Sequence, residues 1–231
     1  MVVLHIPHAS THIPPEIRDQ FLLSDVDLEA EIQAMTDHGT DELFAGHGDV
    51  TVAAEVSRLV VDVERFLDDP MEAVGMGAVY TRTSQQEPLR RPLSPQEHQA
   101  LLDHYYHPHH ARLTQAVEPG CLIIDCHSFP GRALPYEDDQ SLDRPDFCIG
   151  TDDFHTPPEL AAVAVDFLES RGYTVAVNRP FAGTMVPARY YRRDTSVRSI
   201  MIEINRRLYM DDAEGYARTK VVIGELVGAL C

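Results

Sequence analysis

The sequence has little positive charge. Lysine and arginine together number 19, against 37 aspartates and glutamates, so the formal net charge is −18 at pH 7. Such a surface repels nucleic acids and anionic membranes, so we expect neither of them as a partner. Only one of the cations is a lysine, Lys220, and the others are arginines. Arginine is the better residue for holding a carboxylate through two parallel hydrogen bonds.

Long apolar runs are also missing. None approaches the ~18 residues that a membrane-spanning helix needs. The N-terminal residues MVVLHIPHAS lack the basic segment and the small-residue cleavage site of a signal peptide. We therefore expect a cytoplasmic protein that does not associate with membranes.

Cysteine is scarce, and no two cysteines form a CxxC pair. Cys121, Cys126 and Cys148 lie in or beside apolar runs, and Cys231 is the last residue. This placement predicts reduced thiols in the core.

The length and composition predict one α/β domain that spans residues 1–231. In a chain of 231 residues two domains would each be small, and 44% hydrophobic residues suffice for a sizeable core. Strand-like and helical segments alternate, which is typical of helices packed on a parallel sheet. We expect a three-layer sandwich with a largely parallel mixed sheet. The predicted strands are residues 2–8, 50–63, 121–126, 147–150, 173–177 and 199–204, and the predicted helices are residues 25–46, 94–106, 157–171 and 211–230.

Ionisable residues follow several of the predicted strands. In a parallel sheet the carboxyl ends of neighbouring strands meet at one edge, where ligands bind. Imidazoles, carboxylates and an arginine gathered at that edge would form a hydrolytic metal site. The residues at these strand ends are His8, Asp62, Arg65, Asp125, His127 and Glu203.

Zinc chemistry suggests a role for most of these residues. A catalytic zinc takes about three protein ligands and keeps a position open for water. His8 and His127 are the expected ligands, and Asp62 and Asp125 are expected to orient their imidazoles. Glu203 follows a buried apolar run, and we expect it to be the general base that moves a proton from water to the leaving amine.

Eight segments stand out by their order and spacing. They are HIPHASTHIP (5–14), TDHGTDEL (36–43), SRLVVDVERF (57–66), YYHPHHARL (105–113), IIDCHSFP (123–130), FCIGT (147–151), NRPFAGT (178–184) and IEINRRLYM (202–210). Together they resemble the N-formylglutamate amidohydrolase family over nearly the whole chain. The resemblance implies hydrolysis of the amide bond of an N-acyl acidic amino acid, with release of formate and glutamate in the namesake reaction of histidine degradation. It also implies a phosphorylase/hydrolase-like fold, similar to that of the zinc carboxypeptidases and aspartoacylases.

This resemblance implies roles for individual residues. In the carboxypeptidase-like relatives a histidine–serine pair at a strand end supplies a zinc ligand, and His127 and Ser128 match that pair. A DxNR motif carries the arginine that faces the substrate, and Asp62 and Arg65 match its ends. The base is a glutamate on a late strand, in the position of Glu203.

Two positions depart from the carboxypeptidase pattern. The HxxE ligand pair is incomplete, because Thr11 stands where a glutamate would follow His8. The third metal ligand must come from elsewhere, and we expect Asp37, with His12 as the alternative. Glu64 stands where the DxNR motif has asparagine, and its carboxylate would repel an anionic substrate.

Three residues are expected to bind the substrate. Arg65 is the first, and Arg206, which follows Glu203 closely, offers a second planar fork for a carboxylate. Asn178 precedes an Arg–Pro pair and is expected in an extended or turn segment. Residues 181–187 form either a mobile lid over the substrate or an ordinary connection.

The remaining histidines have weaker patterns. His107 and His109 are expected to be solvated or to cap the end of a helix, and His155 is expected at the surface. His110 matches one of the eight segments and is kept as a further site residue. Ser128 is not expected to be a nucleophile, because no GxSxG motif surrounds it.

The sequence therefore predicts a metal-dependent amidohydrolase, with zinc the expected ion, that acts on a small-molecule substrate. Two alternatives stay open. One is a metallohydrolase of another N-acyl amino acid or a small peptide on the same scaffold. The other is a binding module that has lost turnover. The sequence does not specify the oligomeric state.

Overall fold

A mixed sheet of six strands forms the centre of the molecule, in a computed structural model that describes residues 1–231. The strand order is β2-β1-β3-β6-β4-β5. Strands β2, β1, β3 and β6 run parallel, whereas β4 is antiparallel to β6 and parallel to β5. The prediction of a single α/β fold with a largely parallel mixed sheet is confirmed. The strands are β1 (Val2–Ile6), β2 (Val50–Ala53), β3 (Leu122–Phe129), β4 (Phe147–Gly150), β5 (Val175–Val177) and β6 (Arg198–Asn205).

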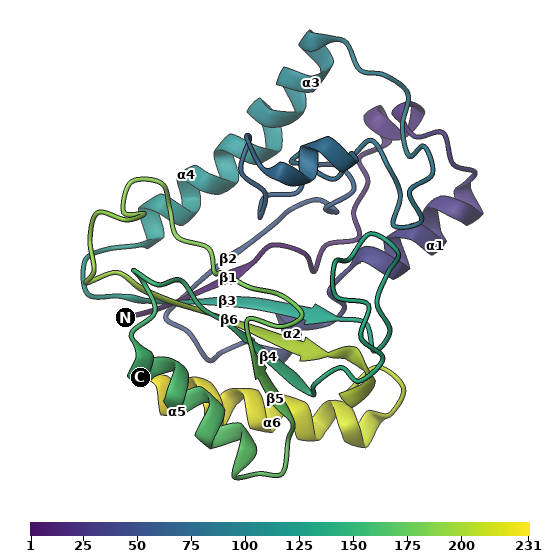
Figure 1. Cartoon of the computed structure of the whole chain (residues 1–231). Coiled ribbons are helices and arrows are strands. Elements are labelled where there is room, and N and C mark those ends of the chain that lie inside the picture. Colours follow the sequence, from purple (N-terminus) through teal and green to yellow (C-terminus); the bar gives the residue numbers. More distant parts are fainter.

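Helices cover both faces of this sheet (Figure 1). Helices α5 (Pro158–Glu169) and α6 (Ala213–Leu230) lie below it in Figure 1, and the core between them contains Leu4, Ile124 and Ile202. Neighbouring strand residues point to the opposite face, where Val3 and Ile123 pack with Leu113 and Val117 near the end of α4 (His107–Ala116). Strands β1, β3 and β4 and nearly all of β6 are buried on both faces, which explains their high content of apolar residues, whereas the edge strands β2 and β5 are only partly buried.

A third cluster of apolar residues lies beyond the β2 side of the sheet. It joins α1 (Asp25–Met35) and α3 (Pro95–Leu101) to the connections at 56–63 and 76–89. The predicted start of α3 is confirmed, since Ser94 and Glu97 form a reciprocal capping box. The other elements are α2 (Thr40–Leu43), the 3-10 helices η1 (Pro15–Gln20), η2 (Pro70–Val74) and η4 (Arg206–Leu208), and the π-helix η3 (Leu102–Tyr106).

The predicted strand over residues 50–63 is wrong beyond residue 53. Leu59, Val60 and Val61 are buried, but they lie in turns outside the sheet. The guanidinium group of Arg90, itself buried, donates hydrogen bonds to the carbonyl groups of Leu59 and Val60. These bonds replace the strand partners that buried carbonyl groups otherwise need, so an apolar run can be buried as a loop.

The predicted helix over residues 25–46 is divided in two. Helix α1 ends at Met35, and Gly39, at φ 73°, precedes α2. The intervening turn carries Asp37, whose backbone N–H donates to the carbonyl of His8 at 2.9 Å. The break therefore places Asp37 beside the end of β1.

No helix has both the length and the apolar character needed to cross a membrane. All four cysteines are unpaired, and Cys121, Cys126 and Cys148 are buried in the core as predicted.

Candidate active site

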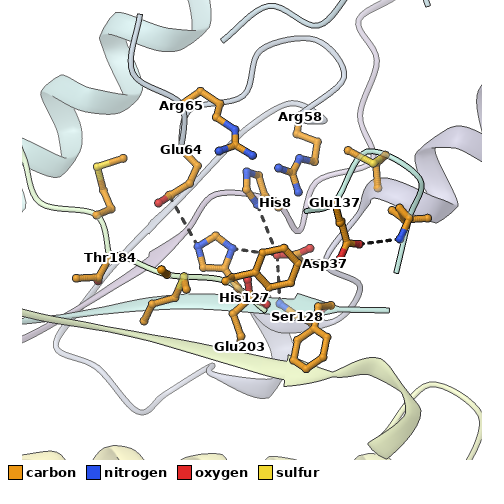
Figure 2. Close-up of a pocket in the computed structure, with 18 of the residues that line it drawn as sticks. His8, Asp37, Arg58, Glu64, Arg65, His127, Ser128, Glu137, Thr184 and Glu203 are labelled. Carbon is orange, nitrogen blue, oxygen red and sulfur yellow. Dashed lines mark hydrogen bonds and ion pairs between the residues drawn. The ribbon is translucent and has the colours of Figure 1, made fainter. Parts of the chain in front are cut away.

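Three predicted metal ligands lie together at the carboxyl ends of β1 and β3. The Nδ1 atom of His127 lies 3.1 Å from Oδ2 of Asp37, and Nδ1 of His8 lies 3.5 Å from the same oxygen. All three side chains are buried. Figure 2 shows them converging from different segments of the chain. His127 lies within β3, which extends three residues beyond the predicted strand, and His8 follows β1.

A buried carboxylate holds each of the two imidazoles through the ring nitrogen that faces away from Asp37. Nε2 of His8 lies 2.8 Å from Oδ1 of Asp62, and Nε2 of His127 lies 3.1 Å from Oδ1 of Asp125. These carboxylates are fully buried and accept hydrogen bonds from Nε2 of the two rings, which turns the Nδ1 edge of each ring toward Asp37. The pKa of Asp62 is held well below its usual range, because Arg58 and His8 outweigh the effect of burial.

Asp37 is held by groups from two other elements. Nη2 of Arg206 donates to its Oδ1 atom at 2.9 Å, and the backbone N–H of Ser128 donates to Oδ2 at 3.2 Å. The hydrogen bond from His127 and the charges of His8 and Arg206 hold the pKa of Asp37 well below its usual range despite its burial. One carboxylate oxygen of Asp37 and the Nδ1 atoms of two imidazoles thus converge on one point, which is the kind of donor set that a cation site requires.

The donor atoms of this cluster fit zinc. Bonds of about 2.0–2.1 Å in a tetrahedron place ligand atoms roughly 3.3 Å apart, and the 3.1 and 3.5 Å separations lie on either side of that value. The buried Nδ1 atom of His8 has no hydrogen-bond partner. A bound ion would satisfy it. His12, the alternative third ligand, is exposed and outside the cluster.

A second group of ionisable residues does not fit an ion in the same way. It consists of His5, Asp125 and Glu64. Nδ1 of His5 lies 2.7 Å from Oδ1 of Asp125, which is the distance of a charge-assisted hydrogen bond and is short for two ligands of one zinc ion.

Glu203 lies on β6, directly opposite His127 in the register of the two strands. Its side chain is 6% exposed and lines the pocket, and its Oε2 atom has no hydrogen-bond partner. Burial raises the pKa of Glu203 to about 8, against the opposing effect of His127. It is therefore a carboxylate with a free oxygen beside the metal cluster.

A cavity of about 280 Å³ opens above these residues. Three arginines line it, and their guanidinium groups differ in availability. Arg58 is paired with Asp62, and Arg206 donates to Asp37, Ser128 and the carbonyl of Ala34. The buried Nε atom of Arg65 has no partner, and its Nη1 atom lies 3.9 Å from the nearest carboxylate. Arg65 is thus the most available cation in the pocket.

Asn178 is not brought to this pocket. It is exposed, and its amide group bonds the backbone N–H and the hydroxyl of Thr151. By contrast, Phe181, Gly183 and Met185 line the pocket, so the segment over 181–187 does border the site.

Two histidines are buried, although His155 was predicted at the surface and His109 was predicted to be solvated or to cap a helix end. His155 is fully buried, where it accepts from the N–H of Arg192 and bonds the carbonyl of Val197. His109 is also buried, with Nε2 at 2.9 Å from Nε2 of His5. Neither contact joins residues close in sequence, so no local pattern indicated it.

Two further residues of the site have no place in the predicted set. Arg58 and Tyr80 both donate hydrogen bonds to Oδ2 of Asp62. The four-residue spacing from Arg58 to Asp62 was a weak indication that the two side chains interact. Tyr80 lies in a different loop, and no sequence pattern indicated its contact with Asp62.

The comparisons with known proteins agree with this architecture. A family model described as N-formylglutamate amidohydrolase matches residues 1–210. The N-formylglutamate deformylase of Pseudomonas putida is 26% identical, over 99% of this chain and 91% of its own length. That of Pseudomonas aeruginosa is 28% identical, over 99% of this chain and 92% of its own length.

Solved structures agree as well. The crystal structure of an N-formylglutamate amidohydrolase from Ralstonia eutropha JMP134 has a TM-score of 0.81 and 26% identity, with 98% of this chain and 91% of that chain covered. A gene product of Agrobacterium tumefaciens has the same fold, with a TM-score of 0.74 at 22% identity over 99% of this chain and 89% of that one. With its family match over residues 1–210 and this shared fold, the chain belongs to the N-formylglutamate amidohydrolase family.

Proposed function

We propose that this protein is a zinc-dependent amidohydrolase that removes the formyl group from an N-formyl amino acid such as N-formylglutamate. The single observation that carries the proposal is the buried group of His8, Asp37 and His127, with the unpartnered carboxylate of Glu203 beside it. The named activity of the relatives from the two Pseudomonas species supports the choice of substrate.

His8, Asp37 and His127 would hold the metal ion. When bound, a divalent ion supplies the Lewis-acid chemistry that makes water a nucleophile near neutral pH and polarises an amide carbonyl. Asp62 and Asp125 keep the Nδ1 lone pairs of the two imidazoles directed at the site.

Glu203 acts as the general base. Its free Oε2 atom accepts a proton from the attacking water, and the same carboxyl group then returns that proton to the leaving nitrogen. Burial raises the pKa of Glu203 above that of an exposed glutamate, which makes its conjugate acid a better match to neutral pH.

Arg65 anchors the carboxylate of the substrate, because it retains an unpaired donor inside the pocket. Arg206 was expected to share this role. Since its guanidinium group already donates to Asp37 and Ser128, we assign it chiefly to holding Asp37 in place.

A metal-content assay on His8→Ala, His127→Ala and His12→Ala tests the proposed ligands. We expect the first two variants to lose the zinc of the wild type, whereas His12→Ala, a matched control on the exposed side of the same loop, should retain it. Deformylation of N-formylglutamate should follow metal content. Full occupancy in both ligand variants would contradict the assignment.

A second candidate substrate follows from the position of Glu64. Its Oε2 atom has no hydrogen-bond partner and lies 3.8 Å from Nε2 of His127, at the lining of the pocket. A carboxylate there disfavours a substrate with two negative charges, so an N-acyl amino acid with an uncharged side chain is the alternative. N-formylglutamine and N-formylglutamate form a matched pair of nearly equal size. The ratio of their kcat/KM values decides between the two candidates.

A further inference from the structure

An aromatic pair lies beside the proposed carboxylate anchor. Phe66 follows Arg65 directly, and Tyr191 comes from the connection between β5 and β6. Both line the cavity, and their ring centroids lie 6.1 Å apart, within the range of interacting aromatic side chains. Phe66 is 41% exposed although it is large and apolar. The pair therefore offers apolar surface to a ligand in a cavity that arginines and carboxylates also line.

The position of this pair relates it to one part of the substrate. Arg65 is the most available cation in the cavity, because Arg58 is paired with Asp62 and Arg206 donates to Asp37. The α-carboxylate and the side chain of an amino acid branch from the same carbon atom. A substrate whose α-carboxylate lies on Arg65 therefore has its side chain within reach of the neighbouring aromatic pair.

A buried histidine packs against Tyr191. His155 is 0% exposed, and its ring is stacked on that of Tyr191, with centroids 5.9 Å apart and an interplanar angle of 22°. The guanidinium carbon of Arg192 lies 5.7 Å from the centroid of the Tyr191 ring. Contacts with Phe66, His155 and Arg192 thus fix the orientation of Tyr191 before a ligand binds.

The hydrogen bonds of His155 have a single possible direction. The backbone N–H of Arg192 donates to its Nε2 atom at 2.8 Å, and its Nδ1 atom lies 2.8 Å from the carbonyl oxygen of Val197. A backbone N–H does not accept and a carbonyl does not donate, so the ring donates from Nδ1 and accepts at Nε2. His155 therefore holds both ends of the connection over 192–197, which leads into β6.

The backbone at Arg192 has a conformation that needs such support. Its φ of 52° lies in the left-handed region, which residues other than glycine rarely adopt. Strained backbone of this kind persists where the surroundings impose it, and it is concentrated at active sites and ligand clamps. Here the bond from the Arg192 N–H to His155 imposes it, and the residue directly before Arg192 is Tyr191.

We propose that Phe66 and Tyr191 form the subsite for the side chain of the substrate, and that His155 is a positioning residue for Tyr191. The substrates that fit are N-formyl amino acids with the α-carboxylate on Arg65 and a side chain whose aliphatic stem lies against the two rings. This inference rests on the proposed function for the amide that is cleaved. Binding of the side chain does not depend on cleavage.

Two pairs of variants test the inference. Tyr191→Phe keeps the ring, whereas Tyr191→Ala removes it. His155→Gln retains an acceptor for the Arg192 N–H near the position of Nε2, whereas His155→Leu fills a similar space without an acceptor. His107→Leu, at a half-exposed position on α4, is the control.

N-formylglutamine and N-formylglycine are the test substrates, because they differ only in the side chain. The values of kcat and KM for both compounds are measured with each zinc-loaded protein. The dissociation constants of the products, L-glutamine and glycine, are measured by calorimetry, which needs no turnover. A melting curve for each variant reports whether it is folded.

We expect the wild type to favour N-formylglutamine over N-formylglycine. Tyr191→Ala and His155→Leu should raise the KM for N-formylglutamine about tenfold, the lower end of what a methylene group contributes in an apolar pocket. Their kcat should stay near that of the wild type, because the side-chain contact is the same in the ground state and the transition state. The KM for N-formylglycine should not change. Tyr191→Phe, His155→Gln and His107→Leu should resemble the wild type.

An unchanged KM for N-formylglutamine in Tyr191→Ala would overturn the subsite, and so would an equal rise for both substrates, because the effect would not involve the side chain. Equal losses in His155→Gln and His155→Leu would overturn the positioning role of the hydrogen bond. If His155→Leu does not fold, His155→Asn replaces it: this variant keeps a donor for Val197, is too short to accept from Arg192, and should raise the same KM.

A wild type that hydrolyses neither compound would contradict the proposed function. The calorimetric comparison would still decide this inference, since L-glutamine should bind more tightly than glycine to the wild type and lose that advantage in Tyr191→Ala. Equal affinities of the two products for the wild type would overturn the subsite, whatever the turnover.

Discussion

At the scale of single residues, two glutamates near His127 could act as the general base, Glu64 and Glu203. They lie on different sides of the His127 ring, and this difference decides between them. Glu64 lies near Nε2 of that ring, the edge already bonded to Asp125. Burial and the charge of Asp125 raise the pKa of Glu64 above its usual value. Glu203 pairs with His127 across the sheet and has its free oxygen in the pocket beside Asp37. Glu203 is therefore the better placed of the two to exchange a proton with water.

Glu203→Gln tests this assignment. The substitution keeps the size of the side chain and removes the base, so we expect kcat to fall about 10²-fold or more, within the usual contribution of a positioned acid–base group. Zinc content and the melting temperature, measured on the same sample, should stay near those of the wild type. Loss of zinc would indicate that Glu203 is a metal ligand. Near-normal turnover with zinc bound would exclude Glu203 as the base.

Arg65→Lys tests the substrate anchor. A lysine ammonium does not reproduce the two parallel hydrogen bonds of a guanidinium group. The loss of one charge-assisted hydrogen bond, worth about 1.5–3 kcal/mol, should lower kcat/KM for N-formylglutamate at least about tenfold. Arg218→Lys, at an exposed position, is the control and should leave kcat/KM unchanged. An unchanged value in the Arg65 variant would show that Arg65 serves only the fold.

At the scale of elements, the sequence predicted most strands and helices correctly because their apolar patterns are regular and buried. Val2–Ile6 is a largely apolar run, the centre of β6 contains the apolar residues Ile200, Met201 and Ile202, and Ser94 and Glu97 have the spacing of a capping box. The strand prediction for residues 59–61 was wrong because the burial of this segment as a loop depends on Arg90, about thirty residues away along the chain. A local sequence pattern indicates that a segment is buried. It does not indicate which distant side chain donates hydrogen bonds to the buried backbone carbonyl groups.

Arg90→Met tests how this segment is held. Methionine retains most of the apolar volume and leaves the carbonyl groups of Leu59 and Val60 without their donor. Each unsatisfied buried group costs about 1–3 kcal/mol, so urea unfolding should show a clearly lower free energy of unfolding. Because Asp62 follows this segment, zinc affinity should also weaken. Arg91→Met, which removes a partly exposed ion pair with Glu97 and leaves Arg90 in place, is the control, and an equal loss in both variants would contradict the explanation.

At the scale of the whole molecule, the fold gathers a site from segments that are far apart along the chain. His8, Asp37, His127 and Glu203 meet because β1, β3 and β6 are parallel neighbours whose carboxyl ends lie at one edge. That edge was predictable from strands followed by ionisable residues. Contacts that reach the edge from outside the sheet, such as those of His109 and Tyr80, were not, because their partners are set by the packing of loops and of α4.

The same gathering of carboxylates makes the stability of the metal-free protein depend on pH. The pKa of Glu203 is raised from 4.5 to about 8 by burial, and that of Glu64 is raised in the same direction. A raised pKa means that the folded state keeps a proton that the unfolded chain releases at lower pH. The resulting contribution to stability is complete below pH 4.5 and is lost as the pH rises through about 8. Asp62 acts in the opposite direction, since its lowered pKa contributes stability that is lost only as the pH falls below 3.8.

We therefore expect the melting temperature of chelator-treated protein to fall as the pH rises from about 5 to about 9, by the equivalent of a few kcal/mol. Glu203→Gln carries no ionisable group at this position and should show a shallower fall. Zinc should also make the fall shallower, because a cation in the site stabilises the charged carboxylates. Melting curves of the wild type and the variant, each with and without zinc, separate the two effects. Parallel curves for the metal-free wild type and Glu203→Gln would mean that Glu203 is already ionised in the folded protein at acidic pH, and its buried, unpartnered oxygen would then need a different explanation.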